Sequence, residues 1–150
     1  MIIVQKATIK KLEDLAQIFD LYRIFYKKES DIEGATQFLK ERLENNESVI
    51  YVAIYEENEQ IVGFVQLYPL FSSTRMQKLW LLNDLYVMKE YRNGGISKML
   101  IEASKNLCIE TNACGLMLET AKDNIIGNQL YPATDFVLDT EHNFYFWDNS

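Results

Sequence analysis

The segment from Tyr91 to Lys98 has the residue types of an anion-binding turn. Arg92, Asn93, Gly94 and Gly95 are consecutive, and residues with helical spacing begin near Ile96. The first N–H groups of a helix have no partners within the helix, and the helix dipole makes that end partly positive. Glycines lack Cβ atoms, so backbone N–H groups can close around phosphate oxygens. The segment therefore predicts phosphate binding, although a plain tight turn ahead of a helix fits the same residues.

Two common phosphate-binding motifs are absent, and the charge balance excludes a further class of partner. The chain has neither a G-x-G-x-x-G fingerprint nor the Gly-Lys-Ser/Thr end of a P-loop. It carries 15 Lys and Arg against 22 Asp and Glu, a net charge of −7 over 150 residues. An acidic protein has little attraction to phosphate backbones, so we expect no nucleic-acid partner. The charge weakly favours small cationic partners instead.

The composition is that of one globular domain. Hydrophobic residues make up 48% and charged residues 25% of the chain, and no apolar run approaches the ~20 residues that cross a bilayer. We therefore expect a single domain over residues 1–150 in a soluble, cytoplasmic protein with no membrane partner. Cys108 and Cys114 are too few and too widely spaced for a zinc site, so we expect reduced thiols and no metal.

The spacing of apolar residues predicts an α/β fold, a mixed α+β sheet with helices packed against it. Pro69 argues against a strand immediately after Leu67, so the residues up to Gln77 are predicted to be a loop. A break is expected over residues 30–34, between the first two helices. Strands are predicted over residues 2–7, 49–55, 61–67, 79–87, 116–120, 136–138 and 144–147, and helices from residue 8, over 36–43, from 96 and over 124–134.

Within this pattern, Arg92-x-x-Gly95-x-Ser97 resembles the R/Q-x-x-G-x-G/A loop of the GNAT superfamily, the acetyl-CoA-dependent N-acetyltransferases. The preceding segment, residues 83–87, is similar to the fourth strand of that family. Ser97 departs from the family pattern, which has Gly or Ala at this position. The element order agrees with the superfamily, and the resemblance implies a central twisted sheet of about seven strands flanked by about four helices.

A second segment carries the same resemblance. Asn124, followed by Gly127, Leu130 and Tyr131, resembles the N-x-x-A-x-x-L-Y cofactor segment of the family. Asp135 stands where the family usually has glycine; aspartate tolerates positive φ, so the turn can be kept. The strands around residues 82–87 and 118–121 resemble the histone- and polyamine-acetyltransferase-like branch.

The resemblance implies that the chain uses acetyl-CoA as a cosubstrate. Backbone groups of Leu85 and Val87 would bond the pantetheine arm, and the Asn124 side chain would touch the arm or the diphosphate. Tyr131 would stand near the sulfur and protonate the leaving thiolate. The residues implied to hold the diphosphate are Arg92, Asn93, Gly94, Gly95, Ile96, Ser97 and Lys98.

A general base must take a proton from the attacking amine, and two carboxylates are candidates. Asp84 lies in an otherwise apolar strand, where an unpaired charge is costly. Glu119 lies near the end of the next predicted strand. Asp84 could equally serve a structural role by bonding a neighbouring loop, and the sequence does not choose between the two carboxylates.

The resemblance thus implies an acyltransferase that moves an acetyl group to a primary amine, either a small cation such as a polyamine or a lysine-like or protein amine. A module that binds CoA or acetyl-CoA without turnover, acting as a sensor or an interaction partner, is the alternative. The aromatic residues 144–147 are expected to seal the sheet or to form a contact in a homodimer.

Overall fold

The computed structural model describes residues 1–150, which divide into two compact units, Met1–Glu119 and Thr120–Ser150. The first unit contains one sheet with three long helices, and the second contains one short helix. No helix in the structure combines the length and the apolar character needed to span a membrane.

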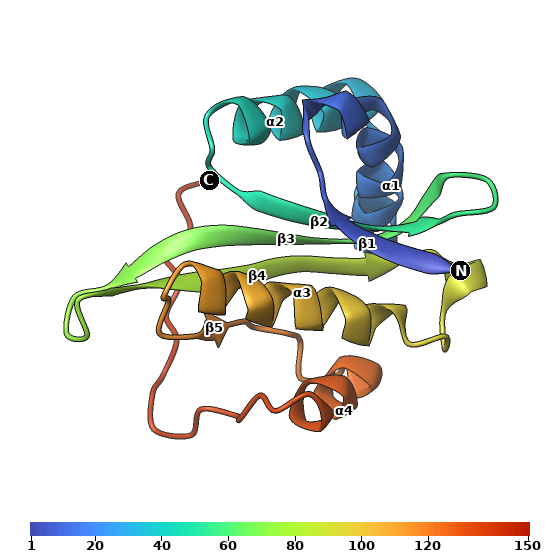
Figure 1. Ribbon diagram of the computed structural model, residues 1–150. Coiled ribbons are helices and arrows are strands. Elements are labelled where there is room, and N and C mark those ends of the chain that lie inside the picture. The colour runs from blue at the N-terminus through green and yellow to red at the C-terminus, as the bar shows by residue number, and fades with distance from the viewer. The chain divides into compact units, whose positions relative to one another are not determined.

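The first unit is built on a five-stranded mixed sheet with the strands in chain order (Figure 1). The first four strands pair antiparallel, and the last is parallel to its neighbour. This arrangement confirms the predicted α/β class with a mixed sheet. The strands are β1 (Ile2–Lys6), β2 (Val49–Tyr55), β3 (Gln60–Ser72), β4 (Gln77–Val87) and β5 (Leu116–Met117).

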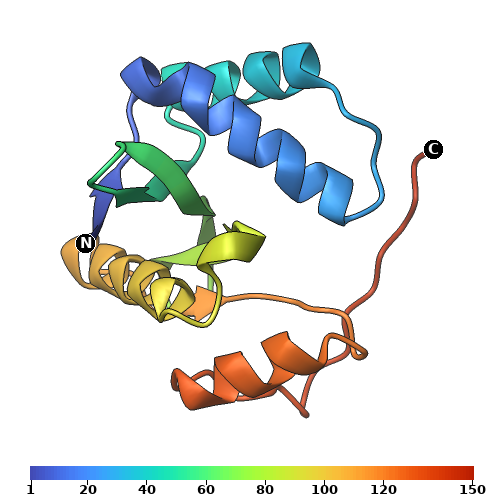
Figure 2. The same ribbon diagram turned by 90° about the vertical axis from the view of Figure 1, so that its right-hand side faces the viewer.

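Helices cover both faces of this sheet (Figures 1 and 2). On one face lie α1 (Leu12–Phe25) and α2 (Ile32–Glu44), and on the other lies α3 (Ile96–Glu110). Apolar residues three and four apart give each helix one buried stripe, which packs on the alternating apolar residues of the strands. The core beneath α1 and α2 is centred on three fully buried side chains, Leu15, Leu39 and Phe64.

A buried carboxylate fixes the connection between α1 and α2. Asp20 of α1 is 4% exposed and accepts hydrogen bonds from the Ser30 hydroxyl and from the Asp31 backbone N–H, both at 2.7 Å. The Asp31 side chain in turn accepts from the Gly34 N–H at 2.9 Å and caps α2. This cap explains why α2 begins at Ile32, within the residues 30–34 that were expected to break the helical pattern.

Asp20→Ala is expected to lower the free energy of unfolding by about 2 kcal/mol, because two donors to a buried carboxylate lose their acceptor. Urea denaturation followed by circular dichroism measures this change. Asp14→Ala, on the exposed first turn of α1, is the matched control and should cost about 0.5 kcal/mol. Equal losses in the two variants would contradict the role given to Asp20.

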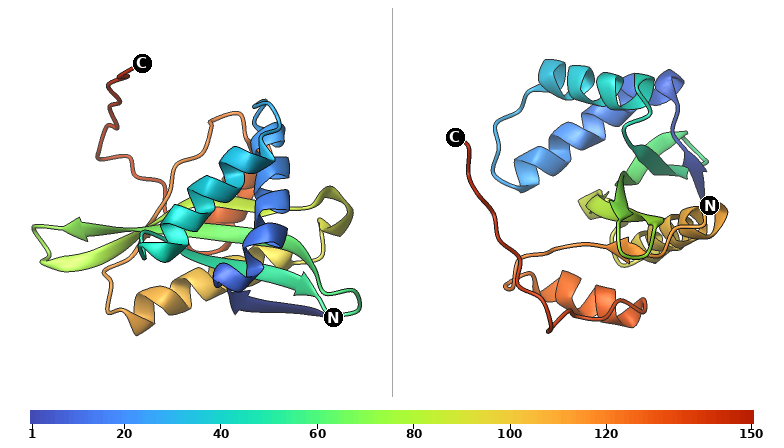
Figure 3. Two further views of the ribbon diagram at one scale, coloured as in Figure 1. Left: turned by 90° about the horizontal axis from the view of Figure 1, so that it is seen from above. Right: turned by 90° about the vertical axis from the view of Figure 1, so that its left-hand side faces the viewer.

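The hairpin of β3 and β4 is longer than predicted. Both strands continue into the expected loop and leave only residues 73–76 as a turn, and Pro69 pairs with Trp80. The β2–β3 pairing ends at Leu67, so Pro69 lies where β3 has a neighbour on one side only, and edge positions tolerate a missing N–H. Figure 3 shows this end of the hairpin running past the other strands.

The predicted strand count is wrong, since the sheet has five strands rather than about seven. The strand expected over 116–120 is only the two residues of β5, and residues 136–138 and 144–147 form no strand. Strand propensity mostly reflects packing against neighbouring strands, so a short apolar run does not establish a strand by itself.

The second unit contains α4 (Ile125–Ala133), which ends one residue after Pro132. The Asn124 side chain caps this helix by accepting from the Gly127 N–H at 3.0 Å. The chain leaves the helix through Asp135, whose φ of 75° confirms that this residue accepts the left-handed conformation. The sequence was correct for this helix because both its cap and its proline are local signals.

Candidate active site

The strand β4 has an unpaired edge over its last residues. β5 pairs with it only at Trp80 and Leu81, whereas β4 continues to Val87. The Met88 N–H donates to the Val62 carbonyl of β3 at 2.8 Å. Because backbone groups alternate in direction along a strand, those of Leu85 and Val87 point away from β3, toward the unpaired edge. An extended ligand can therefore bond there as an added strand would.

A one-residue bulge precedes this edge. Gln66 of β3 pairs with Asp84, while the next residue, Leu67, pairs with Leu82, so Asn83 has no partner. Consecutive residues of β3 face opposite sides of the sheet, and their partners on β4 follow them. The bulge thus places Asp84 on the same face as Gln66, beneath α1.

The glycine turn leads from this edge into α3. Gly95 is the N-cap of the helix with φ of 83°, and Asn93 also has positive φ at 67°. The Met99 N–H donates to the Gly95 carbonyl at 3.1 Å and is the first N–H of the helix with an acceptor. The backbone N–H groups of residues 93–98 have no acceptor within the protein. They form a continuous row of donors at the positive end of a helix.

The surroundings of Gly95 fit a diphosphate group. A Cβ built on this residue would meet no atom within 4 Å, so the space beside the turn is open. Phosphate oxygens bind where several N–H groups converge and no side chain intervenes. The predicted diphosphate residues from Asn93 to Lys98 thus lie in a turn with suitable donors and room.

Arg92 is held in place from two directions. Its Nε donates to the Val87 carbonyl at 2.8 Å. Its guanidinium carbon lies 5.3 Å from the centre of the Phe25 ring and 5.4 Å from that of Tyr86, within the range of a cation–π contact. The Val87 carbonyl is therefore already bonded, and its N–H and the backbone of Leu85 remain for a ligand. The end of α1 helps to set the position of a charge in the glycine turn.

Asp84 is the centre of a buried polar cluster. The residue is 6% exposed, and its carboxylate accepts from the Tyr22 hydroxyl at 2.7 Å, the Gln66 amide at 2.8 Å and the Asn83 amide at 3.1 Å. Burial and the charge of Asp84 raise the pKa of Tyr22 far above its usual value. The same two causes, in that order, raise the pKa of Tyr68 to about 12. Both phenols therefore remain protonated beside the carboxylate.

Glu119 differs from Asp84 in its surroundings. It is exposed and follows the end of β5, outside any strand. It has neither the burial nor the hydrogen-bond partners that hold Asp84.

The two predicted residues of the second unit have structural contacts of their own. The Asn124 side chain accepts from Gly127, as above, and donates to the Thr120 hydroxyl at 2.8 Å. Tyr131 lies in the last turn of α4, and its ring packs edge-on against Phe136 with centres 5.7 Å apart. The Asn124 amide keeps one N–H and one lone pair for a ligand.

Tyr22 and Gln66 are not among the catalytic and cofactor-binding residues predicted above. Gln66 has a recognisable signal, because it is an amide within the apolar run 61–67 and is fully buried. The sequence indicates only that Tyr22 could line the acceptor site, and it favours a core role, since an aromatic residue on the buried stripe of a helix is usual in a core.

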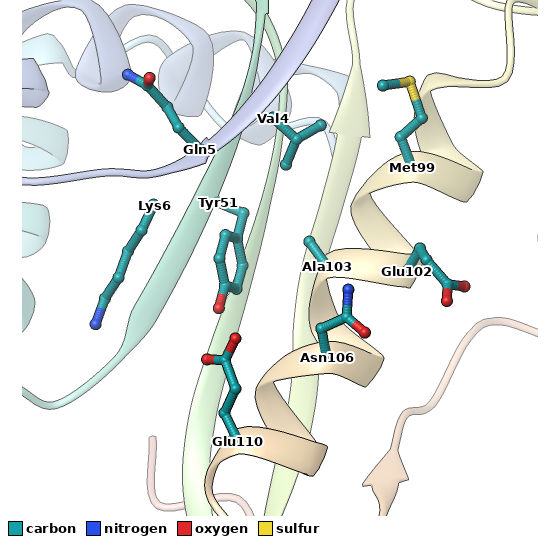
Figure 4. Close-up of a pocket in the computed structure, with 9 residues that line it drawn as sticks. All are labelled: Val4, Gln5, Lys6, Tyr51, Met99, Glu102, Ala103, Asn106 and Glu110. Carbon is teal, nitrogen blue, oxygen red and sulfur yellow. The ribbon is translucent and has the colours of Figure 1, made fainter.

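A separate shallow groove runs along α3 on the other side of the first unit (Figure 4). None of the predicted site residues lines it, and the structure contains no cluster of three or more His, Cys, Asp or Glu suited to a metal ion. The groove is lined by Val4, Gln5, Lys6, Tyr51, Met99, Glu102, Ala103, Asn106 and Glu110.

Comparison with known proteins identifies similar sequences and structures. An uncharacterised N-acetyltransferase of Bacillus subtilis strain 168, YhfO, is 40% identical over 137 residues, which are 91% of each chain. The crystal structure of a probable acetyltransferase is 36% identical with a TM-score of 0.95 and covers 99% of this chain and 98% of that one. The structure of a predicted acetyltransferase from Clostridium acetobutylicum, solved with acetyl-CoA, shares the fold with a TM-score of 0.78 at 20% identity, covering 97% and 96% of the two chains.

A family model places these similarities in one group. Residues 15–136 match the model of the acetyltransferase (GNAT) family, well over half of the chain. The match spans both the glycine turn and α4. The chain therefore belongs to the GNAT family and is an acetyltransferase.

Proposed function

We propose that the protein transfers the acetyl group of acetyl-CoA to a primary amine. The observation that carries this proposal is the row of N–H groups without acceptors at residues 93–98, directly beside the unpaired edge of β4. The row suits a diphosphate, and the edge suits an extended arm with amide groups. Coenzyme A contains both parts, and the C. acetobutylicum structure of the same fold was solved with acetyl-CoA.

Each part of the cosubstrate has proposed partners. The backbone of Leu85 and the N–H of Val87 bind the pantetheine arm, and Asn124 adds a contact through its remaining N–H or lone pair. Residues 92–98 hold the diphosphate, with Arg92 supplying the fixed charge and the backbone the directed donors.

The chemistry requires two proton transfers. When bound, acetyl-CoA supplies a thioester whose acyl carbon is attacked by a neutral amine while a thiolate leaves. Tyr131 is the proposed acid, because a phenol with a pKa near 10 can give its proton to a thiolate formed beside it. Asp84 is the proposed base, since it is buried and fixed by hydrogen bonds, and Glu119 is the second candidate.

The proposed acceptor is a cation in its resting state, such as a polyamine or a lysine-like amine. The net charge of −7 supports this class, and so does the buried carboxylate of Asp84. A sensor that binds CoA without turnover remains the alternative.

An amine panel tests the proposal. Purified protein is given acetyl-CoA with 1,4-diaminobutane, spermidine, n-butylamine or lysine, and free thiol is followed with a chromogenic disulfide reagent. We expect amine-dependent thiol release, with n-butanol as the neutral control that gives none. CoA at a hundredfold excess over its Kd should also stabilise the protein by about 2.7 kcal/mol. Stabilisation with no thiol release for any amine would favour the sensor, and no stabilisation would contradict both functions.

Phe25→Ala is expected to raise the KM for acetyl-CoA about fivefold with little change in kcat, because Arg92 loses one of the two rings that hold it. Steady-state kinetics at saturating amine measure both constants. Phe25→Tyr keeps an aromatic ring and should behave like the unaltered protein. A fall in kcat without a change in KM would show that the ring does not act through the glycine turn.

A further inference from the structure

We propose that Tyr22 is the residue that meets the ammonium group of the acceptor, and that it passes the proton of that group to Asp84. The two residues would form a proton relay. The substrates would then be primary alkylammonium ions rather than neutral acceptors. This inference rests on the proposed function and assigns the deprotonation step within it.

Access to the two groups differs. Asp84 is 6% exposed and its carboxylate is occupied by three donors, so an ammonium ion cannot reach it directly. Tyr22 is partly exposed. Its hydroxyl donates its one proton to Asp84, which leaves the oxygen lone pairs as acceptors for an incoming N–H. Tyr22 is therefore the less buried member of the pair, and its oxygen keeps lone pairs for an incoming N–H.

The charge of Asp84 has no cationic partner within the protein. No Lys, Arg or His nitrogen lies within 4.0 Å of it, although the residue is buried. A buried carboxylate without a cation is costly unless something supplies the opposite charge. An ammonium ion held at the Tyr22 oxygen would do so.

Gln66 supports an ionised Asp84. Its amide nitrogen donates to the carboxylate, while its carbonyl oxygen is buried and has no hydrogen-bond partner. If the amide were turned over, the Gln66 oxygen rather than its nitrogen would lie beside the Asp84 carboxylate, and no hydrogen bond could form. The protein thus accepts an unsatisfied carbonyl in its core in order to present a donor to Asp84.

Aromatic rings fix the orientation of Tyr22. Its ring lies 5.1 Å from Tyr26, 5.5 Å from Phe64 and 6.0 Å from Tyr86, centre to centre, with edge-on geometry in each pair. Such packing restricts the orientation of the ring, and ring faces also attract cations. Asp84 is next in sequence to Leu85, whose backbone lies at the unpaired edge of β4.

The proton transfer balances without any further reactant. An N–H bond of the ammonium breaks as the proton passes to the Tyr22 oxygen, and the Tyr22 O–H bond breaks as its own proton passes to Oδ1 of Asp84. The products are a neutral amine, a neutral phenol and a protonated carboxyl group. The raised pKa of Tyr22 agrees with an exchange in which no free tyrosinate forms.

Tyr22→Phe tests the relay, because it keeps the ring and removes only the hydroxyl. We expect kcat/KM for 1,4-diaminobutane to fall about a hundredfold at pH 7, within the usual range for general base catalysis. The deficit should shrink as the pH approaches 10, since the fraction of amine that is already neutral rises about tenfold per pH unit below its pKa. The Kd for CoA should not change.

Two controls separate this effect from general damage. Tyr55→Phe removes a hydroxyl that donates to Glu57 at 2.7 Å on the exposed end of β2, and it should behave like the unaltered protein. The titratable groups that face Tyr22 are Asp84, Tyr26, Tyr68 and Tyr86. Tyr68 stays neutral below its pKa of about 12, and repeating the profile in Tyr26→Phe and Tyr86→Phe backgrounds removes the other two phenols in turn.

Direct binding gives a readout that does not depend on turnover. Calorimetry of 1,4-diaminobutane with the CoA-bound protein should show at least tenfold weaker binding for Asp84→Asn, with melting temperatures confirming that the variant is folded. Full activity in Tyr22→Phe, or a loss that is the same at every pH, would overturn the relay while amine-dependent thiol release by the unaltered protein keeps the proposed function. Absence of thiol release by the unaltered protein would overturn both.

Discussion

Gly95→Asp is expected to weaken acetyl-CoA binding at least a hundredfold, which corresponds to about 2.7 kcal/mol. The backbone at Gly95 has φ of 83°, but Asp135 adopts 75° in the same protein, so strain alone is not the cause. The new side chain would enter the open space beside the turn and set a negative charge against the diphosphate. Like charges in contact cost several kcal/mol.

Gly95→Asn is the matched control, because asparagine has the same size and also tolerates positive φ. Its loss of affinity should be clearly smaller, and the difference between the two variants measures the charge effect. Isothermal titration calorimetry with CoA gives both values. Unchanged affinity in Gly95→Asp would refute the assignment of the diphosphate to this turn.

Tyr131→Phe is expected to lower kcat at least a hundredfold, because the leaving thiolate loses its proton donor. The ring is kept, so its packing against Phe136 and the stability of the protein should be retained. CoA affinity should stay within a factor of two. Single-turnover thiol release at saturating amine isolates the chemical step.

The pH dependence distinguishes this variant from Tyr22→Phe. Raising the pH supplies neutral amine but no acid, so activity lost in Tyr131→Phe should not return at pH 10. Tyr145→Phe, an exposed tyrosine in the same unit, is the control and should be fully active. A recovery of Tyr131→Phe at high pH would assign Tyr131 to the amine rather than to the thiolate.

Local sequence signals predicted the parts of the fold that depend on neighbours along the chain. The stripe of α3, the strand over residues 49–55 and the helix over residues 124–134 each depend on residues close in sequence, and all three predictions were correct. The position at which a strand ends depends on the neighbouring strands with which it can pair, and these can be distant in sequence. Pro69 was expected to end β3, yet it is tolerated where β2 stops, and the C-terminal apolar runs form no strands.

The residues of the candidate site were likewise predictable only where they are close in sequence. The glycine turn could be predicted because its donors, glycines and helix start are consecutive. The contact between Tyr22 and Asp84 joins residues 62 positions apart, and no periodicity reports it. A single domain over residues 1–150 and a homodimer stay predictions.

The bulge at Asn83 has a consequence for how this chain can change over time. Deleting Asn83 would leave every other pair in place, because Asp84 already pairs with Gln66 and Leu82 with Leu67. A deletion elsewhere in β4 would instead shift the residues from there to the bulge by one position and turn their side chains to the opposite face of the sheet. The chain should therefore tolerate the loss of a residue at Asn83 better than elsewhere in the strand, and a library of single deletions along β4 would show Asn83 as the most tolerant position.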